Sequence, residues 1–278
     1  MNHPSLSRRL MTTGAIITLF FTVLAIASPL LQQLGLVQDP TAFLDFPPQA
    51  PPSGSHWFGT TRLGYDVFSR TVFGSQAALQ VVLLATVLSI AIGVPLGMVS
   101  GYLGGWLDRV LLFAMDTVYT LPGLLLSVTL AFVVGRGVLN AALALSIAYI
   151  PQYYRVVRNQ TASVKSEMFV EAAQAMGAST WRILWRYLAQ NVVQSVPVIL
   201  TLNAADAILT LGGLGFLGLG LPDEVAEWGH DLRQAMDALA TGGAWWTSLF
   251  PGLAMTLMVV GLSLFGEGLS EWTEKKAR

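Results

Sequence analysis

One short segment of the chain has the residue types that suit contact with another macromolecule. Residues 171–177 read EAAQAMG, so Glu171 is the only charge in a run of small and amphipathic residues. Basic residues lie on both sides of the run, namely Arg155, Arg158, Lys165, Arg182 and Arg186. A short helix of this composition, held between two hydrophobic segments, is suited to dock on a soluble partner.

The spacing around this run predicts two helices separated by a break. Gly177 can adopt a positive φ and end the first helix, and Ser179 can cap the second. The apolar face of the first helix could lie in the groove of a partner, or it could rest on lipid headgroups. The residues alone leave both interpretations open. Five residues recur at helical spacing and predict that face: Met168, Phe169, Ala172, Ala173 and Met176.

Three acidic residues fall at or near membrane depth in the apolar runs described below. Asp206 lies in the fifth run with Asn203 one turn before it, and Glu267 lies at the inner end of the sixth. Asp116 lies in the third run, near enough to the inner surface to pair with Arg109. Intramembrane ionisable residues are costly and usually face a cavity or a partner. Asp206 and Asn203 could therefore line a translocation path, or Asp206 could form a helix–helix hydrogen bond or ion pair.

The sequence indicates no other kind of chemical site. His3, His56 and His230 are far apart and show no metal-ligand spacing, and the chain has no cysteine. The glycines between 212 and 220 lack the Lys-Ser/Thr pair of a phosphate loop, so they suit close helix packing or an unwound segment. We predict no catalytic residue, no metal, no bound cofactor and no nucleic-acid partner.

Composition places the chain in a bilayer as an all-α integral membrane protein. Of its 278 residues 54% are hydrophobic and only 11% are charged, against about 25% charged in a soluble domain. Backbone N–H and C=O groups must be hydrogen-bonded within the hydrocarbon core, so each long apolar run is interpreted as a helix. Six runs predict six transmembrane helices, at residues 11–31, 78–100, 110–134, 138–154, 192–211 and 248–266.

The distribution of positive charge predicts the orientation. With both termini in the cytoplasm, 11 of the 15 Lys and Arg residues lie inside, as the positive-inside rule requires. The four outside are Arg62, Arg70, Arg136 and Arg233. Residues 1–77 then form an N-terminal anchor helix and an extracytoplasmic segment. Residues 78–278 form the membrane domain, with a cytoplasmic loop at about 155–190. We interpret the first run as a retained anchor rather than a signal peptide, since no clean cleavage site follows it.

Six ordered segments carry a family resemblance. Residues 154–179, with Glu171-Ala172-Ala173 and Gly177, resemble the cytoplasmic EAA loop of ABC importer permeases. Residues 56–70 (HWFGTTRLGYDVFSR) resemble the segment before the second span in the dipeptide/oligopeptide/nickel permeases. The segments at 216–220, 228–229, 251–252 and 266–269 are similar to the last third of that family. The chain is identified as a C-type transmembrane subunit of this family.

Three positions depart from the family pattern. Gln190 replaces the proline that commonly ends the cytoplasmic loop, which affects the expected bend into the fifth span. Tyr65 stands where the family usually has Arg. Residues 211–213 read LGG where Glu-Ala-Ser is usual, which removes a polar group near the outer mouth.

The resemblance implies an ABC type I importer permease fold in the bacterial inner membrane. It implies that the chain forms half of a pore for peptides or related small solutes, with nickel or metal chelates as further members of the substrate range. The implied partners are a second homologous permease, two ATPase subunits that carry ATP and Mg²⁺, and an extracytoplasmic substrate-binding protein. From the residues alone, a proton-coupled secondary carrier using Asp206 and Asp116 is an alternative. A membrane anchor without transport is another.

Overall fold

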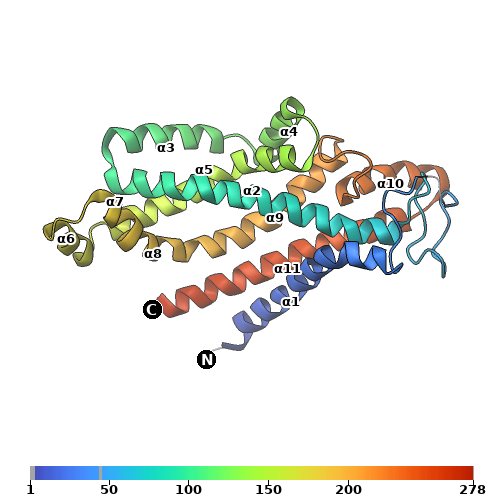
Figure 1. Ribbon diagram of the computed structural model, residues 1–278, viewed down its shortest axis with the longest axis horizontal. Coiled ribbons are helices and arrows are strands. Elements are labelled where there is room, and N and C mark those ends of the chain that lie inside the picture. The colour runs from blue at the N-terminus through green and yellow to red at the C-terminus, as the bar shows by residue number, and fades with distance from the viewer. Residues whose placement is uncertain (1–3, 44–45, 278) are drawn as a thin grey trace.

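The computed structural model describes residues 4–43 and 46–277 and shows an elongated bundle of helices (Figure 1). Within these residues there is no β-strand, only a single bridge between Thr60 and Asp66, so the all-α prediction is confirmed. The helices are α1 (Pro4–Gln33), α2 (Val67–Leu103), α3 (Gly105–Tyr119), α4 (Gly123–Val134), α5 (Val138–Val164), α6 (Met168–Ala175), α7 (Thr180–Arg182), the π-helical η1 (Ile183–Leu188), α8 (Ala189–Val192), the 3₁₀ turn η2 (Val193–Ser195), α9 (Val196–Phe216), α10 (Trp228–Gly242) and α11 (Trp246–Ala277).

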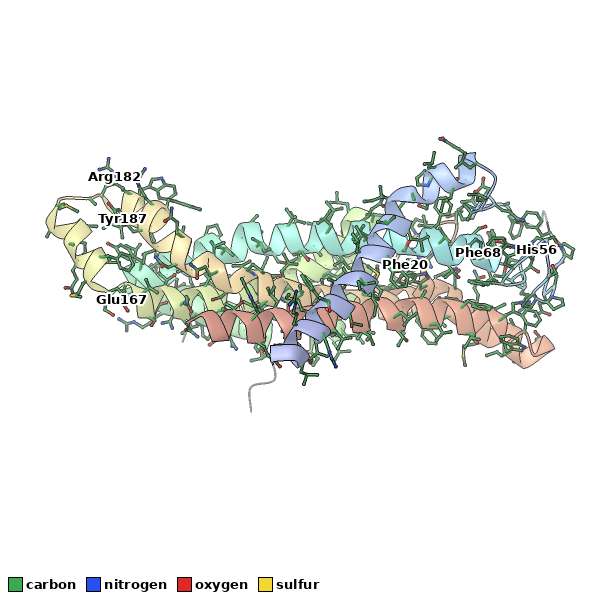
Figure 2. All side chains as sticks on the ribbon, turned by 90° about the horizontal axis from the view of Figure 1, so that it is seen from below. Phe20, His56, Phe68, Glu167, Arg182 and Tyr187 are labelled. Atoms are coloured by element: carbon green, nitrogen blue, oxygen red, sulfur yellow. The ribbon has the colours of Figure 1, made fainter. Side chains whose placement is uncertain are left out.

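Different elements cover the two ends of the bundle. In Figure 1, α6 and α7 lie at one end of the long axis, and α10 lies at the other beside the loop that precedes α2. Figure 2 shows the same separation, with Glu167, Arg182 and Tyr187 at one end and His56 and Phe68 at the other. We call these the α6 end and the α10 end. The beginning of α1 and the end of α11 both lie toward the α6 end (Figure 1).

Four stretches are long and apolar enough to cross a membrane. They are Leu6–Gln33, Val67–Leu103, Thr180–Phe216 and Trp246–Thr273, which correspond to the predicted first, second, fifth and sixth spans. The second and fifth begin about ten residues earlier than the apolar runs indicated. Since α2 continues without interruption through residues 77 and 78, the boundary expected there falls inside a helix.

The predicted third span is wrong as one continuous helix. Residues 110–134 divide into α3 and α4, which are bent by 89° at a short break. Pro122 supplies the physical reason, because it has no N–H and disfavours helical backbone at Leu121 before it. Gly123 then begins α4 in a new direction.

The predicted fourth span, α5, is less apolar than the other spans, and much of its surface packs on other helices. It packs on α2, α3, α4 and α9, and Leu145, Tyr153 and Val157 are fully buried. It also extends ten residues beyond the predicted end at 154. A helix that packs on four others needs less lipid-facing surface, so its sequence can include polar residues.

Glycines allow α2 to pack closely on α5. Gly93, Gly97 and Gly101 follow one another at four-residue spacing along α2. A Cβ at these positions would lie 2.8, 2.6 and 2.5 Å from the α5 carbonyl oxygens of Ile150, Tyr154 and Arg158. Small residues at this spacing permit the close backbone approach typical of membrane helices.

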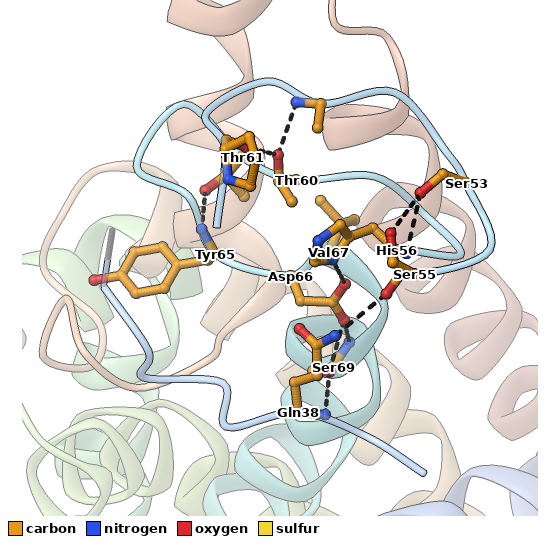
Figure 3. A network of polar contacts seen from close by, with 12 residues as sticks. Gln38, Ser53, Ser55, His56, Thr60, Thr61, Tyr65, Asp66, Val67 and Ser69 are labelled. Atoms are coloured by element: carbon orange, nitrogen blue, oxygen red, sulfur yellow. Dashed lines mark hydrogen bonds and ion pairs between the residues drawn. The ribbon is translucent and has the colours of Figure 1, made fainter. Parts of the chain in front are cut away.

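The segment between α1 and α2 forms a polar layer at the α10 end (Figure 3). Asp66 caps α2 by accepting hydrogen bonds from the Ser69 amide at 2.8 Å and the Ser69 hydroxyl at 2.6 Å. His56 Nδ1 lies 3.1 Å from the other carboxylate oxygen of Asp66. Gln38 N donates to Ser69 Oγ at 2.8 Å, which ties the loop to the beginning of α2.

Candidate functional site

The segment predicted to dock on a partner has the expected helix–break–helix structure. α6 covers Met168–Ala175, and Gly177 follows it with φ +79°. The Ala178 amide donates to the Ala173 carbonyl at 3.0 Å, which satisfies an end group of α6. Ser179 Oγ then accepts from the Arg182 amide at 3.4 Å and caps α7. Both local signals, Gly177 and Ser179, are confirmed.

The five apolar residues predicted for one face of α6 divide between two surfaces. Met168 and Met176 are 83% and 77% exposed, Ala172 is also exposed and Phe169 is 40% exposed. Ala173 is fully buried in the core of this chain, so the prediction that it shares the exposed face is wrong. Val170, which the sequence analysis did not single out, is buried beside it. The three-residue spacing of Val170 and Ala173 is the signal that could have identified this inward face.

Polar groups complete the exposed side of α6 and connect it to the bundle. Glu171 is exposed, in the first turn of α6. Gln174 Nε2 donates to the hydroxyl of Tyr102 near the end of α2 at 3.2 Å. The α6 segment is therefore attached to α2 on one side and presents Glu171, Met168 and Met176 on the other.

The expected partner of Asp116 is also corrected. Asp116 Oδ1 accepts from Arg155 Nη2 at 2.7 Å and from Arg155 Nε at 3.0 Å, rather than pairing with Arg109. Arg109 and Asp116 are seven residues apart on α3, about 10 Å along the axis, which is too far for direct contact. Asp108 is bound in the same way by Arg158 of α5. Two of the basic residues before the docking segment therefore join α5 to α3.

An open hollow of about 950 Å³ lies beside the docking segment. Trp181 and Trp185 line it and pack edge-to-face with ring centroids 5.5 Å apart. Arg182 and Arg186 line it too, so the hollow combines aromatic surface with positive charge. Gln190, the residue that replaces the family's proline, lies on its rim within a helical turn.

Asp206 is exposed on α9 and takes part in a contact with α5. The hydroxyl of Tyr149 donates to Asp206 Oδ2 at 2.7 Å and lies 3.3 Å from the hydroxyl of Thr210. Asp206 lines a cavity of about 350 Å³ together with residues 119–123 of the α3–α4 break. Asn203 is buried instead, with no hydrogen-bond partner for its Nδ2 among the described residues, and it does not line this cavity.

The motif at 56–70 helps to build the α10 end. Arg70 is 1% exposed, and its Nε donates to Asp231 Oδ1 at 2.7 Å. Its guanidinium also lies over the ring of Tyr65 at 4.7 Å from the centroid, so the residue that departs from the family pattern packs on a buried arginine. Glu227 accepts from the amides of Gly229 and His230 at 2.8 and 2.9 Å and caps α10. Burial raises the pKa of Glu227 to about 7.

The glycines near residue 212 serve close packing. Gly212 and Gly213 lie inside α9, and a Cβ at Gly229 of α10 would collide with the Gly212 backbone. Of the two interpretations from the sequence, helix packing is confirmed for this pair. In the described part of the chain, no group of three or more His, Asp or Glu residues is placed to hold a metal ion.

Comparison with known proteins agrees with this arrangement. Residues 93–278 match the family model described as "Binding-protein-dependent transport system inner membrane component". A D,D-dipeptide transport system permease protein of Escherichia coli K12 is 36% identical over 96% of this chain and 88% of its own length. A dipeptide transport system permease protein of Alkalihalophilus pseudofirmus is 34% identical over 97% of this chain and 87% of its own length. A glutathione transport system permease protein of Shigella flexneri is 38% identical over 82% of this chain and 74% of its own length.

A solved structure shares the fold. A chain of the MetNI methionine ABC transporter, in an inward-facing conformation, superposes with a TM-score of 0.59 at 17% identity. The match covers 75% of this chain and 97% of that one. Several apolar helices together with the family match place the protein in the bacterial inner membrane. The chain belongs to the family of binding-protein-dependent transport system inner membrane components and is a permease subunit of an ABC importer.

Proposed function

We propose that this chain forms one half of the translocation pore of an ATP-driven importer for peptides or related small solutes. Relatives at 34 to 38% identity are named for D,D-dipeptides, dipeptides and glutathione, which supports a small peptide as cargo. A second, related permease would supply the other half. An extracytoplasmic binding protein would deliver the cargo at the α10 end. Nickel and metal chelates remain within the proposed substrate range.

The observation that carries the proposal is the position of α6 at the end of the bundle. This helix lies at one extreme of the bundle (Figure 1). Its Glu171, Met168 and Met176 are exposed. The chain has no nucleotide-binding motif of its own, so energy would arrive through a contact with an ATPase. We assign the α6 end to the cytoplasm and the exposed side of α6 to the groove of that ATPase. Two ATPase subunits, one for each permease, would carry ATP and Mg²⁺.

The ion pairs of α5 support this coupling. Arg155 and Arg158 hold α3 through Asp116 and Asp108, and only three residues separate the end of α5 from the beginning of α6. A displacement of α6 would therefore move α5 and α3 together, as the near-rigid helix motions of alternating access require. The same contacts argue against a proton relay between Asp116 and Asp206, because each acid is bound to a different partner.

Substitution of the docking segment tests the proposal. Glu171→Ala removes an exposed charge, and Gly177→Val places a branched residue at φ +79°, where side chains are strained. No atom lies within 4 Å of a Cβ at Gly177, so the effect would come from the backbone rather than from a clash. The double variant should insert normally, lose co-purifying ATPase and uncouple hydrolysis from uptake. Removing one partner of a desolvated charged pair typically costs about 2–5 kcal/mol of binding.

Gly54→Val is the matched control. Gly54 also has open space around its Cβ position, but its φ is not positive and it lies at the α10 end. This variant should retain wild-type ATPase association. Wild-type co-purification, hydrolysis and uptake in the Glu171→Ala, Gly177→Val double variant would mean that α6 does not couple the two subunits.

A further inference from the structure

The cavity beside the α3–α4 break has an anionic side. Asp206 of α9 and Tyr149 of α5 line one part of it, and residues 119–123 line another. The carboxylate is exposed, and the only hydrogen bond that it receives from the described residues is the one from Tyr149 to Oδ2. No Lys, Arg or His of the described chain lies within ion-pair distance of it.

One guanidinium does contact the cavity wall, but it is already bound to another carboxylate. Arg155 lies over the ring of Tyr119 at 4.0 Å from the centroid, and its Nε and Nη2 both donate to Asp116. Asp206 therefore has an unbonded oxygen, Oδ1, and no counter-ion within the chain. A carboxylate on a membrane helix is costly against lipid, so it needs a polar occupant, water or a partner.

The backbone at the break adds hydrogen-bond acceptors. Pro122 interrupts the helical pattern, and the carbonyl oxygens of Tyr119, Thr120 and Leu121 receive no hydrogen bond from the described residues. Irregular backbone at membrane depth is tolerated where it lines a cavity. The carbonyl end of a broken helix is the end that favours a cation.

Asp206 decides the sign of the potential in this cavity. The carbonyl end of α3 and the amide end of α4 both meet at the break, and each carries about half an elementary charge of opposite sign. These two contributions oppose each other. The full charge of the Asp206 carboxylate therefore outweighs the difference between them.

We propose that this cavity binds the protonated amino group of the transported solute, with the Asp206 carboxylate as its counter-ion. This inference rests on the proposed function and adds the substrate chemistry. A primary ammonium has three N–H donors, which suit Asp206 Oδ1 and the free carbonyl oxygens of the break. Tyr149 is a positioning residue, because its hydroxyl holds Oδ2 and leaves Oδ1 toward the occupant.

The test uses the absence of cysteine from the native chain. Thr120→Cys places a thiol at an exposed position of the cavity wall. In the assembled complex in nanodiscs, its labelling rate is measured with a cationic trimethylammonium-ethyl methanethiosulfonate and with an anionic sulfonatoethyl methanethiosulfonate. Mass spectrometry of this chain measures the labelling rate with each reagent. The cation should react faster, and Asp206→Asn, which removes one unit charge from the cavity wall, should lower the ratio of the two rates about tenfold.

Two further variants separate charge from folding. Asp206→Glu keeps the carboxylate and should retain most of the ratio. Asp237→Asn removes the same charge from a site at the α10 end that is 75% exposed and should leave the ratio unchanged. Dialanine, which has a free ammonium, should slow labelling of the cysteine, whereas N-acetyl-dialanine should not.

Several results would overturn the inference. An unchanged ratio in Asp206→Asn would show that this carboxylate does not set the potential. A cysteine that neither reagent reaches would show that the second permease covers the cavity. Equal protection by the two peptides, or none by dialanine, would remove the role of the ammonium group. Because labelling needs no ATP, these failures are distinct from failure of the proposed function, which would appear as uptake independent of ATP.

Discussion

Arg70 and Asp231 form an ion pair inside the α10 end, although 161 residues separate them in the chain. Nε and Oδ1 lie 2.7 Å apart, and the two side chains are 1% and 5% exposed. Arg70 also donates to the carbonyl oxygens of Pro40 and Val225 at 3.1 and 3.2 Å. One guanidinium thus joins α2, α10 and the two loops that precede these helices.

Removing either partner of this pair should destabilise the α10 end. Arg70→Met leaves Asp231 buried without a counter-ion, and Asp231→Leu does the same to Arg70. Each single change should cost about 3–5 kcal/mol of stability, as found for broken buried pairs. Thermal unfolding of the purified protein measures the effect. The double variant should recover part of the lost stability, since it leaves no uncompensated charge. A double variant whose loss of stability equals the sum of the two single losses would contradict this account.

The protonation of Glu227 should make stability depend on pH. Burial raises the pKa of this carboxyl to about 7 in the folded protein, against about 4.3 in an unfolded chain. Between these values the folded protein holds a proton that the unfolded chain releases. Stability from this group is therefore fully present below about pH 4.3 and is lost as the pH rises through about 7.

Glu227→Gln should flatten this part of the stability curve, because the amide does not titrate. Melting temperatures at several pH values between 5 and 8 measure the slope for each variant. Glu224→Gln, a change of the same kind at an exposed position of the neighbouring loop, should follow the wild-type curve. If Glu227→Gln also follows it, the carboxyl does not hold a proton in the folded protein.

The proposed orientation can be tested with single cysteines. Ser53, Ser163 and Thr241 are all exposed, with Ser163 at the α6 end of α5 and Thr241 in α10. An impermeant thiol reagent applied to intact spheroplasts should label cysteines at Ser53 and Thr241 and leave one at Ser163 protected until the membrane is opened. Labelling only at Ser163 would reverse the assignment of the two ends.

Gly74 should tolerate no side chain. A Cβ at this position would collide with the indole nitrogen of Trp228, which is 2% exposed and donates to the Thr71 carbonyl at 3.0 Å. Gly74→Ala should therefore destabilise the protein by about 1–3 kcal/mol through overpacking. Gly252→Ala in α11 is the control, since its nearest atom would lie at an ordinary 3.7 Å. An equal change in melting temperature for both variants would contradict the packing argument.

Features with a local cause could be predicted from the sequence. Gly177 and Ser179 determine the break after α6 through their own backbone and side-chain preferences, and the structure has that break. Pro122 was an equally local signal for the division of α3 from α4, but the continuous apolar composition of residues 110–134 outweighed it in the sequence interpretation.

Features that depend on distant neighbours could not be predicted. Asp116 pairs with Arg155 because α3 lies on α5, and nothing in the sequence near Asp116 specifies that packing. Ala173 faces the core rather than a partner for the same reason. The cavity at Asp206 also needs three segments far apart in the chain, so the sequence could identify the acid without identifying its surroundings.

The close contact between α2 and α5 has a mechanical consequence. Three α2 glycines lie against α5 carbonyl groups, so a side chain larger than glycine on this face of α2 would force the two helices apart. We expect the two helices to move as one unit, and α2 alone, with 37 residues, is about 55 Å long. A displacement of α6, which follows α5, would then be transmitted to the beginning of α2, beside Asp66 and Arg70. The polar layer at the α10 end would then respond to a displacement at the α6 end, although the two lie at opposite ends of the bundle.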